Sequence, residues 1–214
     1  MKIKVYIIPL VIFSLLLIGA KPLKSFDSPS FFDLNEQAII KNGDFIENGV
    51  KMNYYSKADI EIEYERLLKV FKKNDMNEKQ FNNKIMYKNL EKDISVTLWE
   101  ENSKTMVEVI YINNNSSKSS LSLKKELEKL QNNNSNKEQY CFFVKGKIKE
   151  ESNGETEELL RNSIEEDTLK TIYIHNGHTS TAKFKDGQRV NIGYMKYDSG
   201  RQVIIGTPVI FVTY

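Results

Sequence analysis

The chain is poor in the residues that build disulfide and metal sites. Its 214 residues include one cysteine and two histidines. A single cysteine, Cys141, cannot form a disulfide within the chain, so packing alone must stabilise the fold. Because Cys141 lies in the apolar run Tyr140–Val144, we expect a small buried core residue rather than a reactive thiol.

An excess of charge of one sign is also missing. The chain has 31 basic and 29 acidic residues. The two numbers are equal once Lys2 and Lys4 of the N-terminal segment are set aside. Acidic and basic residues are interleaved, as in Lys147–Glu151. A nucleic-acid-binding domain normally has a strongly basic composition with its charge collected on one face. We therefore expect no nucleic-acid partner.

Only one long apolar run occurs, Val5–Ala20, and it follows two lysines and ends before Lys21 and Pro22. This pattern is typical of a secretory signal, which predicts an exported protein, secreted or held at the outer face of the cytoplasmic membrane. The run is shorter than the roughly 20 residues of a membrane-spanning helix. Ile18–Ala20 is an imperfect cleavage site, and Pro22 disfavours processing. Two alternatives stay open for residues 1–20: a cleaved signal peptide, or an anchor that contacts the membrane through residues 5–20.

Turn and cap signals divide the rest of the chain into a tether at residues 21–30 and one domain with two halves, 31–136 and 137–214. In the first half we expect a helix from about 31 to 42, a strand at 44–55, a helix at 60–74, strands at 81–87, 94–100 and 105–112, and a helix at 121–130. In the second half we expect a strand at 138–149, a helix at 153–166, and strands at 169–175, 178–185, 188–197 and 201–213.

Both halves thus have the order strand, helix and meandering strands, which predicts an α+β fold. We expect two curved antiparallel sheets with helices on one face, whose edges could join into one long surface. An exposed sheet face of this kind would serve for interaction rather than catalysis. Asn48-Gly49 predicts a turn or bulge, and the asparagine tracts that begin at Asn113 and Asn132 predict surface loops.

The two histidines, His175 and His178, flank Asn176-Gly177. A two-residue turn there would place the imidazoles opposite each other on one face of a hairpin. A zinc site needs a third or fourth ligand, and the sequence provides no nearby cysteine. We therefore interpret both residues as surface turn histidines and predict no metal and no cofactor.

No catalytic motif stands out. The chain has no Gly-x-Ser-x-Gly elbow, phosphate-binding loop or dinucleotide fingerprint. The carboxylate pairs Glu100-Glu101, Glu150-Glu151 and Glu165-Glu166 lack the aromatic surroundings that raise a catalytic pKa. We expect Trp99 to lie in the core or on a sheet face rather than to form a sugar platform. We therefore predict no catalytic residues and a protein that is not an enzyme; the alternative is an envelope hydrolase with a dispersed site.

The C-terminal sequence contains Gly206, Thr207 and Pro208 and ends at Tyr214, and Cys141–Gly146 forms a mid-chain strand pattern. With this ending and this mid-chain strand, the chain resembles the YwmB-like family of spore-forming Gram-positive bacteria. The resemblance implies a fold like that of the TATA-box-binding protein, a saddle of two strand–helix–strands halves. The family's activity is uncharacterised, so it implies no catalytic residues. Pro208 indicates an edge or a bulge in the last strand, because proline cannot donate to a ladder.

We therefore expect a non-enzymatic extracytoplasmic protein. It would bind a protein or a cell-wall component through a sheet surface, in envelope remodelling or sporulation.

Overall fold

The computed structural model describes residues 30–42, 44–73, 79–81, 83–148 and 155–212, which form an α+β fold with a single antiparallel sheet. The predicted signal or anchor and nearly all of the tether lie outside the described residues. The helices are α2 (Phe31–Asn42), α3 (Ile60–Lys73), α4 (Ser120–Glu128), α5 (Glu155–Ser163) and the short 3-10 helix η3 (Glu166–Thr168). The strands are β1 (Asp44–Ser56), β2 (Lys79–Phe81), β3 (Lys84–Lys88), β4 (Lys92–Glu101), β5 (Lys104–Asn113), β6 (Ser135–Lys147), β7 (Lys170–Ile174), β8 (Gly177–Lys183), β9 (Arg189–Tyr197) and β10 (Gly200–Thr207).

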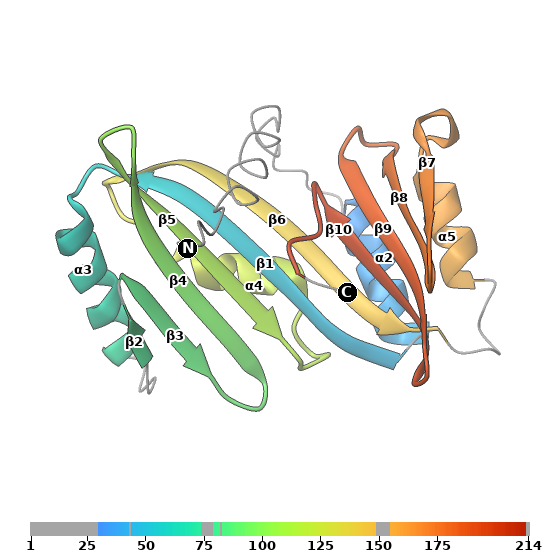
Figure 1. Cartoon of the computed structure of the whole chain (residues 1–214), viewed down its shortest axis with the longest axis horizontal. Helices are drawn as coiled ribbons and strands as arrows, with labels where there is room; N and C mark the ends of the chain where they lie inside the picture. The colour runs from blue at the N-terminus through green and yellow to red at the C-terminus, as the bar shows by residue number, and fades with distance from the viewer. Residues whose placement is uncertain (1–29, 43, 74–78, 82, 149–154, 213–214) are drawn as a thin grey trace, which may run out of the picture.

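The sheet has ten strands in the order β2-β3-β4-β5-β1-β6-β10-β9-β8-β7. In each half the first strand pairs with the last, and the others follow in reverse order. β1 and β6 lie side by side at the centre, and β2 and β7 form the edges (Figure 1). Two sheets whose edges could join were expected, and the edges do join: β1 and β6 pair from Asp44↔Lys147 to Ser56↔Ser135, with two register shifts, so the halves form one sheet.

One face of the sheet carries the hydrophobic core. On β1, the side chains of Val50, Met52 and Tyr54 have no solvent exposure, whereas the intervening Lys51 and Asn53 are half-buried on the other face. This alternation follows the period-two pattern predicted for the strand at 44–55.

All four described α-helices lie on the core face of the sheet. Figure 1 shows α2 and α4 behind the central strands. Each helix adds buried apolar side chains to one continuous core, among them Phe32 and Ile39 of α2, Leu67 and Phe71 of α3, Leu123 and Leu127 of α4, and Leu160 of α5. We call the opposite face the open face; it is defined by the side chains that alternate with the core, such as Lys51 on β1 and Thr97 on β4.

Two local predictions are wrong. Asn48-Gly49 forms neither a turn nor a bulge, because both residues lie within β1 and pair in register with β5 and β6; the nearby register shift lies between Phe45 and Glu47. The last strand ends at Thr207 rather than at residue 213. Pro208 has no N–H to donate, and the chain leaves the ladder at that point.

A buried carboxyl, Glu36, ties together α2, β1 and α4. It is 1% exposed and accepts hydrogen bonds from Asn48 Nδ2 at 2.8 Å, from the Ser120 backbone N–H at 2.9 Å and from Ser120 Oγ at 2.6 Å. Asn113, expected in a surface loop, is also buried and donates to Asn48 Oδ1 at 2.8 Å. Because Ser120 is the first residue of α4, the carboxyl lies at the positive end of that helix.

Candidate interaction surface

The chain folds back over the open face after β10. We call residues 208–212 the C-terminal segment; it follows a cis peptide bond between Thr207 and Pro208. Asn191 of β9 donates from Nδ2 to the Pro208 carbonyl at 2.7 Å. A Cβ added at Gly206 would lie 2.7 Å from Ile210 Cγ1. Position 206 therefore favours glycine, because the segment lies directly on the end of its own strand.

Phe211 of this segment covers the centre of the open face. Its ring meets the ring of Phe143 edge-on, with 5.1 Å between centroids. Register places Phe143 on the open face, opposite Gly49 and Gly206, yet its side chain is completely buried. Lys51 Nζ lies 5.8 Å from the Phe211 ring centroid, within cation–π range. The middle of the open face is thus an apolar contact covered by the chain itself.

Charges on the first half of the open face, β1 to β5, are balanced. Lys51 Nζ lies 3.5 Å from a Glu108 carboxylate oxygen, and Lys88 Nζ lies 3.1 Å from an Asp93 oxygen. Register adds further groups of both signs to this half: Glu47, Lys84, Glu101 and Lys104.

The second half, β6 to β10, carries basic groups on the open face. These are Lys145 and Lys147 of β6, Lys170 of β7, Lys183 of β8 and Arg189 of β9. Strands β7 to β10 contain no aspartate or glutamate. The overall composition hides this asymmetry between the halves.

An aromatic group lies at one end of the first half. Trp99, 38% exposed, sits on the open face opposite Met106, which is in turn opposite Tyr55. The Tyr55 hydroxyl donates to Glu101 at 2.9 Å, and this hydrogen bond raises the pKa of the phenol. The sequence left core and sheet face open for Trp99, and the structure places it on the sheet face.

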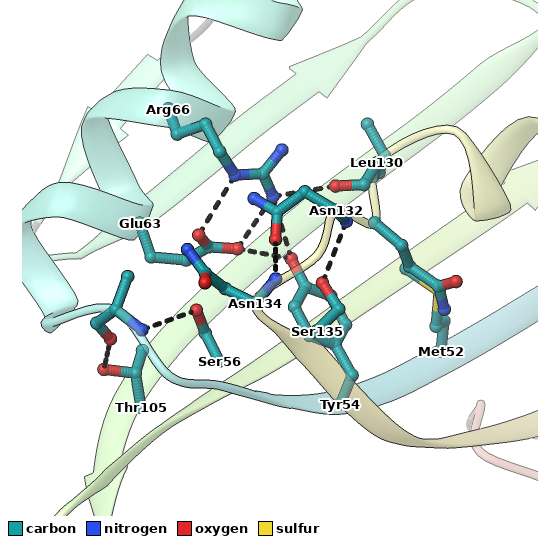
Figure 2. Close-up of polar contacts among 12 residues, drawn as sticks. Met52, Tyr54, Ser56, Glu63, Arg66, Thr105, Leu130, Asn132, Asn134 and Ser135 are labelled. Carbon is teal, nitrogen blue, oxygen red and sulfur yellow. Dashed lines mark hydrogen bonds and ion pairs between the residues drawn. The ribbon is translucent and has the colours of Figure 1, made fainter.

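A polar cluster joins β1, α3 and the end of α4 on the core side of the sheet (Figure 2). Glu63 accepts from Arg66 Nη2 at 2.7 Å and from the Tyr54 hydroxyl at 2.9 Å. Arg66 Nη2 also donates to the Leu130 carbonyl at 2.7 Å. Burial raises the pKa of Glu63, but hydrogen bonds from Arg66 and Tyr54 outweigh it and lower the pKa overall. These groups satisfy one another, which fits a structural role.

A hollow of about 580 Å³ lies between the β1–α3 connection and the turn between β4 and β5. Its lining includes Asp59, Glu61 and Glu100 together with Lys57 and Lys104. Of the residues weighed in the sequence analysis, Glu100 lines the hollow, whereas His175, His178 and Cys141 do not.

The two histidines do not face each other, so that prediction is wrong. Ile174↔Gly177 closes the β7–β8 hairpin; His175 lies in the turn, and His178 is opposite Tyr173. The His178 ring packs against that of Tyr194 with 4.9 Å between centroids. In this register a Cβ at Gly177 would lie 1.9 Å from the Tyr194 carbonyl oxygen, so only glycine fits where the hairpin meets β9.

The remaining candidates are not brought together. In the part of the chain that the structure describes, no group of three or more His, Cys, Asp or Glu side chains could hold a metal ion. Glu100 and Glu101 are neighbours on β4 and point to opposite faces, and Glu165 and Glu166 lie at η3. The pair Glu150-Glu151 lies outside the described residues.

Cys141 is 3% exposed and lies on the open face, opposite Lys51. Burial raises the pKa of its thiol to about 11. Because the thiolate is the reactive form, we expect native Cys141 to react with a disulfide reagent at pH 8 about a hundredfold more slowly than in guanidinium. Stopped-flow absorbance measures both rates, with glutathione as the reference thiol. Equal rates in the two states would contradict the buried position.

No model of a known protein family matches the chain, and no curated protein matches it either. No helix within the described ranges is long and apolar enough to cross a membrane.

Proposed function

We propose that the protein is a non-enzymatic extracytoplasmic binding protein, which holds a protein or a cell-wall component against the open face in envelope remodelling or sporulation. One observation carries the proposal. All four described α-helices lie on one face of a ten-stranded sheet, so the other face presents side chains from β1 and from β3 to β10. The basic and apolar N-terminal segment supports export.

We also propose a saddle like that of the TATA-box-binding protein and membership in the YwmB-like family. The matching strand order of the halves, β1-β5-β4-β3-β2 and β6-β10-β9-β8-β7, supports the likeness. Nucleic-acid binding is not part of the proposal. Minor-groove-binding proteins insert exposed apolar wedges between bases, whereas the central Phe143 lies buried beneath Phe211.

Photocrosslinking in intact cells tests the proposed binding. A p-benzoylphenylalanine at Ser95 or Thr97, on the open face of β4, should give a discrete crosslinked product. The same residue at Glu65 of α3 or Glu158 of α5, both exposed on the helices, is the control and should give none. Equal products from the helices and the sheet, or none at all, would contradict the proposal.

A further inference from the structure

The basic groups on the second half of the open face form two sets. Lys183 and Arg189 are directly opposite in the β8–β9 register, and Lys170 is opposite Thr181, two residues from Lys183. Lys145 and Lys147 lie further along the sheet, on β6. Lys147 is level with Met195, because both are opposite Gln202, and Met195 lies six residues beyond Arg189 on β9. These groups therefore extend over about 20 Å along the strands.

Like charges directly opposite each other destabilise an antiparallel pair. Lys170, Lys183 and Arg189 are exposed and form no ion pair among the described side chains, whereas Lys145 lies opposite Glu47 in the β1–β6 register. A bound anionic surface would turn this repulsion into attraction.

Exposed apolar side chains lie on the same face. Register puts Ile172 and Ile174 of the edge strand β7 on the open face, where they are 65% and 43% exposed. The neighbouring positions on the same face of the sheet carry small residues, Thr179 on β8 and Gly193 on β9. Large apolar side chains among unpaired basic ones are typical of surfaces that bind the interface of an anionic bilayer.

The chain also enters the domain at this end. The Phe31 ring at the start of α2 stacks on Phe184 with 6.3 Å between centroids, and the Phe31 N–H donates to Asp186 Oδ2 at 3.4 Å. Phe184 and Asp186 belong to the connection between Lys183 and Arg189. Residues 21–30 reach at most about 35 Å when extended, so a membrane-held N-terminus would keep the basic groups near the bilayer.

We propose that the second half of the open face docks on the surface of an anionic phospholipid bilayer. Lys145, Lys147, Lys170, Lys183 and Arg189 would contact headgroup phosphates, while Ile172 and Ile174 enter the interface. This contact goes beyond the proposed function, since it uses β6 to β10 and leaves the first half for another partner.

Two other polyanions fit less well. A single-stranded nucleic acid is normally held by exposed aromatic rings on which its bases stack. The aromatic residues that register places on this half are the buried Phe143 and the half-buried Tyr197. A soluble phosphodiester polymer would use the charges but would leave Ile172 and Ile174 exposed to water.

Vesicle co-sedimentation tests the proposal. The chain from Lys21 onward is suitable, because every residue of the core lies between Phe32 and Ile205. We expect it to bind phosphatidylcholine vesicles that contain phosphatidylglycerol, more weakly as salt rises, and not to bind pure phosphatidylcholine. The variant K170Q/K183Q/R189Q should lose roughly a hundredfold in affinity, and I172S/I174S several-fold.

Matched controls are available in the first half. K84Q/K88Q/K104Q removes the same charge from the same face, and Met86→Ser replaces a 40% exposed apolar residue on the open face of β3. Both should bind like the wild type, and melting curves check that every variant is folded.

Several outcomes would overturn the docking proposal: equal losses in the two triple variants, equal binding to neutral vesicles, or no binding at all. It would also be overturned if soluble poly(glycerol phosphate) or single-stranded DNA competed fully and the isoleucine variant bound normally. If vesicle binding fails but crosslinks form at Ser95 or Thr97, the docking proposal is wrong and the proposed function is retained. If vesicle binding succeeds but no crosslinks form, the proposed function is wrong and only the membrane contact is retained.

Discussion

Replacing Glu36 with alanine should lower the free energy of unfolding by about 3 kcal/mol. The change leaves the Asn48 amide and the Ser120 N–H and hydroxyl without their acceptor in a buried site, and each unsatisfied buried donor costs about 1–3 kcal/mol. Urea unfolding followed by circular dichroism measures the loss. Glu65→Ala, at an exposed position of α3, is the control and should change stability by less than about 0.5 kcal/mol.

The same variant has a pH dependence whose sign the structure gives. Burial raises the pKa of Glu36 above its ordinary value of 4.5, although hydrogen bonds from Ser120 and Asn48 oppose the shift. A raised folded-state pKa contributes stability that is fully present below pH 4.5 and is lost as the pH rises through the folded-state value. The loss in free energy of unfolding caused by Glu36→Ala should therefore be larger at pH 4 than at pH 8. A loss that increases with pH would contradict a raised pKa for Glu36.

Replacing Gly177 with alanine should lower the free energy of unfolding by roughly 3 kcal/mol. The new Cβ would lie 1.9 Å from the Tyr194 carbonyl oxygen, and backbone atoms cannot move away as a flexible side chain can. The β7–β8 hairpin must then separate from β9. Hydrogen exchange should show this as lost protection in residues 170–183, while β4 and β5 stay protected.

Gly187→Ala is the matched control for this prediction. Gly187 has φ +84° and nothing within 4 Å of an added Cβ, so alanine there suffers only the unfavourable backbone conformation, about 1 kcal/mol. If Gly177→Ala cost no more than Gly187→Ala, the close approach of the hairpin to β9 would be wrong.

Elements with a short hydrophobic repeat could be predicted from the sequence. The alternation of Val50, Met52 and Tyr54 predicted β1 and its buried face, because one side of the strand meets helices. The apolar stripe that includes Leu67 and Phe71 likewise predicted α3 and its contact with the core. The order of elements also predicted an antiparallel α+β fold, although it left open how the halves join.

Features made by distant residues were not readable. Glu36 looks like any helix-surface glutamate until Ser120 and Asn48 come beside it. The His175–His178 prediction failed because the turn is His175-Asn176, one residue earlier than expected, and the close contact of Gly177 with Tyr194 in this register belongs to a third strand.

The candidate surface was predicted only as a sheet face. Its charge asymmetry required the register, since alternate residues such as Lys145 and Val144 point to opposite faces. A formal net charge of only +2 therefore concealed a basic half.

The C-terminal segment limits the length of what the open face can hold. A ligand confined to β7, β8 and β9 leaves Phe211 in place, whereas one that extends across both halves must first remove its ring from Phe143. Exposing a phenylalanine costs about 2 kcal/mol, so the spanning ligand loses roughly thirtyfold in apparent affinity. The segment thus selects for partners that leave the contact between Phe211 and Phe143 covered, and shortening the chain before Pro208 would remove that preference.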